Sequence, residues 1–121
     1  MPTAGIKGMM TIPCRILWVS RHDPTPIQYR ELNRIFGDYR IILHKRPVES
    51  AKEIVDLMSE HIANEVVVVL PIQLIEDLYT LFSVQPIRAH MHRVSDVDGQ
   101  VQFEHDYFYR VKKIEFVTEV L

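Results

Sequence analysis

Two short apolar runs constrain the fold of this chain more than any other feature. Residues 16–19 read Ile-Leu-Trp-Val, and residues 66–69 are all valine. A strand that is covered on one face alternates apolar and polar residues, whereas a strand buried on both faces is apolar throughout. Strands of the second kind occur mostly in sheets with helices on both sides. The two runs therefore predict the central strands of a parallel α/β sheet.

The segment after the first run carries several helix-start signals together. Thr25 is a favoured N-cap residue, Pro26 suits the first helical position, and Gln28 lies where a capping box needs its second member. Apolar residues then recur at helical spacing until Gly37, which is typical of a helix C-cap. The sequence therefore predicts a helix that begins at Pro26 and ends before Gly37.

Two further strand–helix pairs follow along the chain. Residues 39–43 and 65–70 are predicted strands, the second of them rich in β-branched side chains. A helix between them opens with a capping box at Ser50, and its inward apolar stripe extends to Ile62. A third helix is predicted over residues 71–83.

The C-terminal third of the chain changes character, because alternation replaces helical spacing. Residues 87–94 and 101–107 flank Asp98-Gly99, a dipeptide typical of two-residue hairpin turns. These two segments predict an antiparallel hairpin. Residues 112–120 alternate again and predict one more strand.

This order of elements predicts an α/β fold, namely a small Rossmann-like three-layer sandwich. Right-handed crossovers place the second and third strands on opposite sides of the first. The expected parallel sheet therefore has the order 2-1-3-4, followed by an antiparallel hairpin and tail. We expect a single domain over residues 14–121 and a flexible N-terminal tail over residues 1–13. Open α/β sheets bind ligands where the strand order reverses, which here is between the first and third strands.

Composition narrows the range of functions. The chain has 121 residues and a formal net charge of −2, so bulk binding to nucleic acid is not expected. Cys14 is the only cysteine, so no internal disulfide can form and a cytoplasmic location is expected. No apolar run approaches the roughly 20 residues that cross a membrane, and no membrane partner is expected. The sequence identifies no cofactor.

Candidate site residues cluster in the turn after the first strand. Ser20 can donate and accept hydrogen bonds, Arg21 can bind an oxyanion through two parallel bonds, and His22 can exchange a proton near neutral pH. Asp23 can orient His22 or pair with Arg21, and Thr25 opens the helix. The position at the switch point favours a ligand site. The alternative is an ordinary polar turn with solvated charges.

Other residues are expected at the same edge of the sheet. His44, Lys45 and Arg46 follow the second strand and would form a second wall for an anionic ligand, with Gln73 early in the third helix. The alternative is that all four are solvated surface residues. Glycine-rich phosphate loops are excluded because the turn contains no glycine and its two prolines lack an N–H.

Three histidines form a candidate metal site. If Asp98 and Gly99 are the two central turn residues, His92 faces His105, and His90 lies on the same face of the hairpin. Three imidazoles on one face are typical ligands of zinc. The alternative is a half-exposed polar face, and a bulge of one residue would separate the three side chains.

The sequence favours a small ligand-binding domain that holds a nucleotide or another phosphorylated or anionic ligand. In its topology the expected arrangement resembles small Rossmann-like ligand-sensing domains, including nucleotide-sensing domains of prokaryotic defence systems. One alternative is a phosphodiesterase-type hydrolase, in which His22 acts as general acid or base and Arg21 stabilises negative charge. Another is a homo-oligomer without a small ligand, paired through residues 112–120. A homodimer is compatible with all three.

Overall fold

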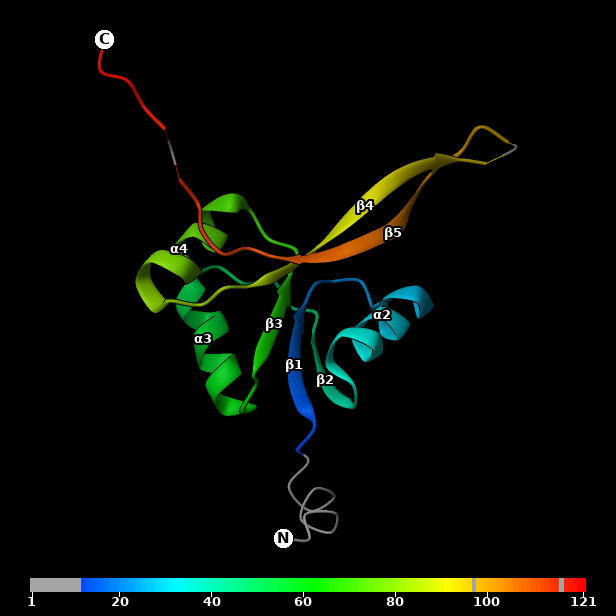
Figure 1. Ribbon diagram of the computed structural model, residues 1–121, viewed down its shortest axis with the longest axis horizontal. Helices are drawn as coiled ribbons and strands as arrows, with labels where there is room; N and C mark the ends of the chain where they lie inside the picture. The colour runs from blue at the N-terminus through cyan, green and yellow to red at the C-terminus, as the bar shows by residue number, and fades with distance from the viewer. Residues whose placement is uncertain (1–11, 97, 116) are drawn as a thin grey trace, which may run out of the picture.

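A five-stranded sheet organises the protein, which a computed structural model describes over residues 12–96, 98–115 and 117–121 (Figure 1). The strand order is β2-β1-β3-β4-β5, and β5 alone runs antiparallel to its neighbour. The predicted order 2-1-3-4 is thereby confirmed. The strands are β1 (Cys14–Val19), β2 (Tyr39–His44), β3 (Glu65–Val68), β4 (Ile87–Ser95) and β5 (Val101–Arg110).

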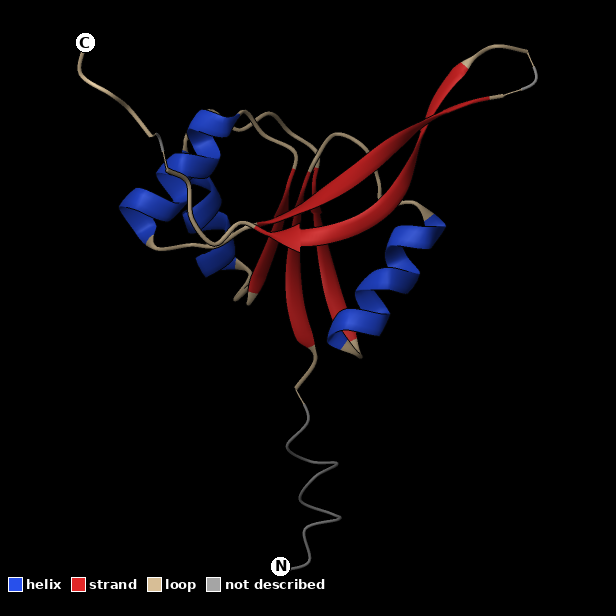
Figure 2. Ribbon diagram, turned by 45° about the horizontal axis from the view of Figure 1, so that its top comes forward, coloured by secondary structure: helices blue, strands red, loops and turns tan. Residues whose placement is uncertain are grey.

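Helices cover both faces of the sheet and make it the middle of three layers (Figure 2). One face carries α2 (Pro26–Phe36), and the other carries α3 (Ala51–Glu60) and α4 (Ile72–Phe82). Alternate residues of β1 enter the two halves of the core. Ile16 and Trp18 pack toward α2, whereas Leu17 and Val19 pack toward α3 and α4. The uninterrupted apolar run reflects this burial on both sides.

Two predicted elements end two residues earlier in the structure than expected. The second helix was expected to keep Ile62 on its inward face, but α3 ends at Glu60. Ile62 has a positive φ of 53° and its side chain is 74% exposed, because the chain turns there toward β3. The third strand was expected to reach residue 70, but β3 ends at Val68 and Val69 is exposed.

The hairpin of β4 and β5 is formed as predicted, but its register is not. Asp96 donates its N–H to the Gln100 carbonyl, and Gln100 donates its N–H to Asp96 Oδ1, so the loop holds three residues rather than two. Gly99 in this loop has the positive φ that favours glycine. A bulge follows: His90 pairs with Tyr107, but Met91 pairs with His105, which leaves Asp106 as the extra residue. The pairing of Val97 with Gln100, which a two-residue turn at Asp98-Gly99 also predicts, lies outside the described residues.

The strand predicted over residues 112–120 is absent from the described part of that segment. Only its start packs on the domain, where Val111 donates its N–H to the Pro86 carbonyl and Ile114 contacts the α3–α4 side of the core. Val117 and Val120 are 95% and 97% exposed. Alternation alone does not produce a strand, because a strand also needs a partner, and the described residues of this segment pair with neither edge of the sheet. Among the described helices, none is long and apolar enough to span a membrane.

Candidate functional site

The turn that follows β1 is held against the carboxyl ends of the strands by three hydrogen bonds. Ser20 donates its N–H to the His44 carbonyl at 3.2 Å, which ties the turn to β2. The Ser20 Oγ accepts the His22 N–H at 3.1 Å, and the Trp18 Nε1–H donates to the His22 carbonyl at 2.9 Å. The backbone is therefore fixed while the Arg21 and His22 side chains stay exposed.

Side chains at the start of α2 occupy the backbone N–H groups of that helix start. The Gln28 N–H donates to Thr25 Oγ1 at 3.2 Å, and Gln28 Oε1 accepts the Thr25 N–H at 2.9 Å, so the predicted capping box is complete. Pro24 and Pro26 have no N–H to offer. Helix starts bind anions through free N–H groups, and this helix start has few left.

A pocket of about 250 Å³ opens on the α3–α4 side of the turn, and we call it the basic pocket. It contains three cationic side chains, those of Arg21, Lys45 and Arg46, from the ends of β1 and β2. Lys45 Nζ lies 2.7 Å from Asp23 Oδ1, which links the two turns. The remaining lining residues are Val19, Ser20, Pro47, Val48, Val69 and Leu70.

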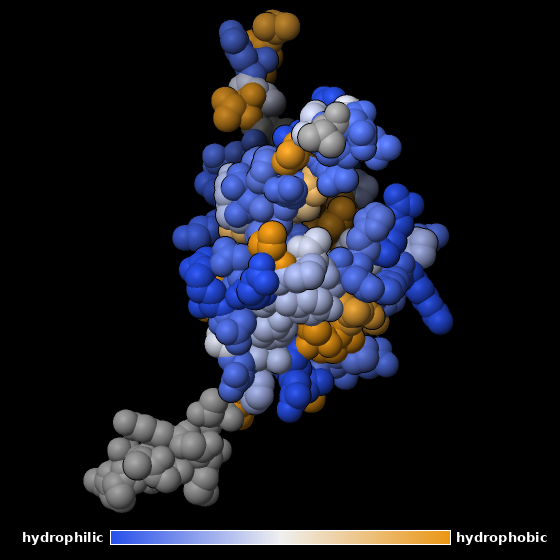
Figure 3. Space-filling view, turned by 90° about the vertical axis from the view of Figure 1, so that its right-hand side faces the viewer, coloured by the Kyte–Doolittle hydropathy of each residue, from blue (hydrophilic) through white to orange (hydrophobic). Residues whose placement is uncertain are grey.

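A second pocket of about 550 Å³ lies on the other face of the sheet, and we call it the α2-side pocket. Since α2 is the one described helix on this face, part of β3 and β4 stays uncovered by helices (Figure 2), and Val67, Ala89 and Met91 of these strands line the pocket. Apolar atoms are also recessed below the hairpin tip in the space-filling view (Figure 3). The lining residues are Trp18, Ser20, His22, Asp23, Thr25, Gln28, Val67, Val69, Ala89 and Met91.

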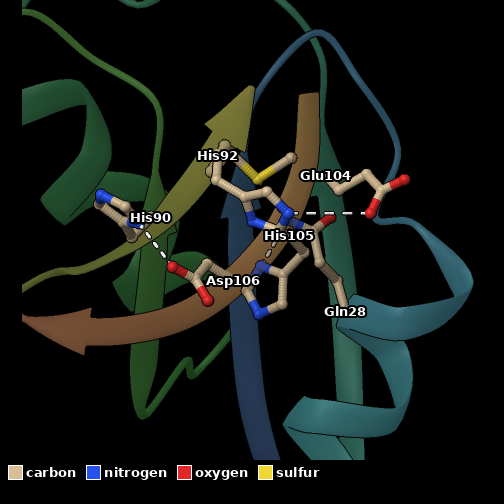
Figure 4. A network of polar contacts seen from close by, with 7 residues as sticks. Gln28, His90, His92, Glu104, His105 and Asp106 are labelled. Atoms are coloured by element: carbon tan, nitrogen blue, oxygen red, sulfur yellow. Dashed lines mark hydrogen bonds and ion pairs between the residues drawn. The ribbon is translucent and has the colours of Figure 1, made fainter. Parts of the chain in front are cut away.

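A buried polar pair lies beside this pocket (Figure 4). Gln28 Nε2 lies 3.4 Å from His105 Nδ1 and 3.8 Å from the Met91 sulfur. Since Gln28 Oε1 already accepts from Thr25, its amide nitrogen faces the imidazole and donates to Nδ1, which assigns the ring proton to Nε2. The His105 side chain is 8% exposed, and burial lowers the pKa of its imidazole. Its Nε2 has no partner among the described residues.

The structure brings most of the predicted site residues together around the two pockets. Those that line one or both are Ser20, Arg21, His22, Asp23, Thr25, Lys45 and Arg46. His44 contributes its backbone carbonyl to the turn but lines neither pocket. Gln73 is exposed on α4 and also lines neither.

Six residues of the α2-side pocket were not identified from the sequence as site residues, namely Trp18, Gln28, Val67, Val69, Ala89 and Met91. Trp18 and Gln28 were assigned to the core and to the helix cap, and both roles are real. Met91 reaches the pocket because it lies on the same face of β4 as Ile87, which packs in the α2 half of the core. The sequence contained one signal that Gln28 belongs to the site. Its capping box with Thr25 places both side chains at the start of α2, beside the switch point of the sheet.

The three histidines of the candidate metal site are not gathered on one face. His90 Nδ1 lies 3.2 Å from Asp106 Oδ2, and its ring stacks on Tyr107. His92 Nε2 lies 3.8 Å from Glu104, whereas His105 points toward α2 (Figure 4). The bulge separates them, because it reverses the faces of the residues beyond it. No group of three or more histidine, cysteine or acidic side chains that could hold a metal ion occurs among the described residues.

The polar groups of the turn support binding more directly than catalysis. The hydrogen bonds that His22 makes with described residues use its backbone N–H and carbonyl, and its imidazole lines the α2-side pocket. Catalytic imidazoles are commonly oriented by a hydrogen bond to a second group. What the site binds has to be inferred from its own geometry. No family model, curated protein or solved structure matches this chain.

Proposed function

We propose that the protein is a small ligand-binding domain that holds a nucleotide or another phosphorylated, anionic ligand at the carboxyl ends of β1 and β3. One observation carries this proposal: Arg21, Lys45 and Arg46 line a single pocket at the switch point of the sheet. Ligands of open α/β sheets bind at this position. Guanidinium groups bind phosphate through two parallel, charge-assisted hydrogen bonds.

The charge balance of the basic pocket favours an anion. Its lining holds three cationic side chains and no carboxylate. Asp23 is the nearby acid, and its ion pair with Lys45 leaves the two arginines as the principal uncompensated charges. The Arg21 side chain is exposed, so it can adjust to a ligand without breaking an internal bond.

Thermal shift and calorimetry test the proposal. We expect nucleoside monophosphates, diphosphates or cyclic nucleotides to raise the melting temperature, since a ligand that binds only the folded state stabilises it. Loss of a hydrogen bond to a charged group removes about 1.5–3 kcal/mol, so Arg21→Ala should weaken binding roughly tenfold to a hundredfold.

Arg30→Ala is the matched control, because Arg30 is an exposed arginine of α2 that lines neither pocket. It should leave the affinity unchanged. Equal affinities for Arg21→Ala and the unaltered chain would contradict the proposal, as would the absence of a shift with every phosphorylated ligand.

The mixtures of protein and nucleotide from these titrations also distinguish binding from hydrolysis. A binding domain returns the nucleotide intact, and chromatography of the mixtures after long incubation measures this. The phosphodiesterase alternative instead requires product that disappears with His22→Ala while binding persists.

A homodimer is the second candidate, and the exposed outer edge of β5 favours it. Among the described residues β5 pairs only with β4, through nine of its ten residues, and Phe103 on it is 65% exposed. Such an edge can add a strand from a second copy. Light scattering should therefore report a dimer, and Phe103→Lys should shift it toward a monomer. A monomeric unaltered chain would remove this candidate.

A further inference from the structure

The two pockets are adjacent parts of one site. Ser20 and Val69, at the ends of β1 and β3, line both of them. One ligand can therefore pass over the carboxyl ends of these strands and occupy both faces of the sheet. The combined space is in keeping with typical small-molecule sites, which measure about 300–1,000 Å³.

The α2-side pocket is unsuited to a phosphate. Its lining includes no lysine or arginine, and its one carboxylate, that of Asp23, repels anions. The nearby start of α2 does not compensate, because the capping box uses the N–H groups of Thr25 and Gln28. The negatively charged part of a ligand is therefore restricted to the basic pocket.

The same lining suits an uncharged, planar ring. Trp18, Val67, Ala89 and Met91 supply apolar surface, and polar groups of the turn and of α2 lie around it. This combination of apolar walls with a few convergent polar groups is typical of sites for aromatic ligands. The thioether of Met91 also contacts aromatic rings favourably.

We infer that the ligand is a nucleotide bound across Ser20, with its phosphate in the basic pocket and its base in the α2-side pocket. This inference rests on the proposed function for the phosphate and adds the position of the base. The ribose lies over Ser20 and Val69, and the Asp23 carboxylate is available to accept a hydrogen bond from its hydroxyls.

A comparison of ligands tests where the base binds. The four ribonucleoside 5′-monophosphates, ribose 5-phosphate and inorganic phosphate are titrated by calorimetry and by the fluorescence of Trp18, the only tryptophan. Base contacts with aromatic and apolar side chains give at least one monophosphate an advantage of about tenfold or more over ribose 5-phosphate. Trp18 fluorescence should change with that monophosphate and not with inorganic phosphate.

Two substitutions in the α2-side pocket separate the base from the phosphate. Ala89→Leu fills the pocket, and Met91→Ala removes apolar surface from it while leaving the space open. Both should reduce the affinity for the preferred monophosphate toward that for ribose 5-phosphate. Neither should change the affinity for ribose 5-phosphate, whereas Arg21→Ala should weaken both ligands. An unchanged melting temperature without ligand shows that each variant is folded.

The outcomes distinguish this inference from the proposed function. If ribose 5-phosphate binds as tightly as every monophosphate and depends on Arg21, the base does not use the α2-side pocket but the phosphate site stands. If no phosphorylated compound binds, the proposed function fails. If free nucleosides bind as tightly as their monophosphates and Arg21→Ala has no effect, the bridged arrangement is wrong.

Discussion

His105 shows at the scale of one residue how a buried titratable group links stability to pH. Its imidazole accepts a hydrogen bond from Gln28, lies 4.5 Å from the Phe108 ring between centroids, and is almost fully buried. Burial lowers the pKa of the ring below its ordinary value of 6.5, because the charged form loses hydration. Burial in the folded state therefore favours the neutral form of this histidine.

We expect the free energy of unfolding to fall as the pH falls below about 6.5. The unfolded chain takes up a proton there while folded His105 resists it, so its contribution is complete above that pH and is lost as the medium becomes acidic. Urea denaturation of the unaltered chain and of His105→Gln measures this. The variant should show a smaller loss between pH 7.5 and 5.5, and a loss of the same size in both chains would contradict the assignment.

Cys14 gives a second prediction at this scale. Burial raises the pKa of its thiol, the Glu65 carboxylate adds to the effect, and Arg110 opposes it. Because the thiolate is the reactive form, iodoacetamide should modify the folded protein more slowly at pH 8 than the chain unfolded in urea. Mass spectrometry of timed samples measures both rates, and equal rates would contradict the prediction.

At the scale of the element, α2 is the helix whose sequence signals correspond most closely to its structure. The predicted N-cap, capping box and C-cap are all present at Thr25, Gln28 and Gly37. Such signals are local, because each depends on side chains within four residues, and a single sequence is enough to identify them. The end of α3 was harder to predict, since Ile62 continues the apolar spacing but lies in a left-handed turn.

Thr25→Ala should lower the free energy of unfolding by about 1 kcal/mol, because the Gln28 N–H loses its acceptor. Thr25→Ser keeps the hydroxyl and should retain most of the stability. Urea denaturation measures both variants. A Thr25→Ala protein as stable as the unaltered chain would show that the capping box contributes nothing.

The last strand is tied to the interior of the sheet by one ion pair. Arg110 of β5 donates to both carboxylate oxygens of Glu65, at 2.9 and 2.6 Å, and also to the Gln85 carbonyl at 3.0 Å. Its side chain is about one-third exposed, which weakens the pair through solvent screening. The contact nevertheless connects β5 with β3 across the strand between them.

We expect Arg110→Ala to destabilise the protein by about 1–2 kcal/mol. Arg110→Lys should recover only part of this, since an ammonium group cannot form both bonds in the same geometry. Denaturation at low and high salt checks the electrostatic part, because the difference between the variants should shrink as the salt concentration rises. A difference independent of salt would indicate that packing dominates.

At the scale of the whole molecule, the sheet order was predictable and the complete site was not. The apolar runs and the alternation of strands with helices were sufficient for the order 2-1-3-4 and hence for the switch point. The basic pocket follows from that topology, because parallel strands end at the same edge. The α2-side pocket does not, since it forms where α2 leaves part of this face of the sheet uncovered, and no local pattern determines how a helix packs across a sheet.

The bulge at Asp106 affects much more of the surface than one residue suggests. Side chains of Val101, Phe103 and His105 share the face of Phe108 only because one extra residue shifts the phase of the strand between them. Regular pairing of the same chain through Asp106, without the bulge, would instead turn Gln102 and Glu104 toward that face and the valine and phenylalanine away from it. Deletion of Asp106 would remove the bulge and leave both faces of the hairpin unchanged, because His105 and Tyr107 would then alternate as neighbours.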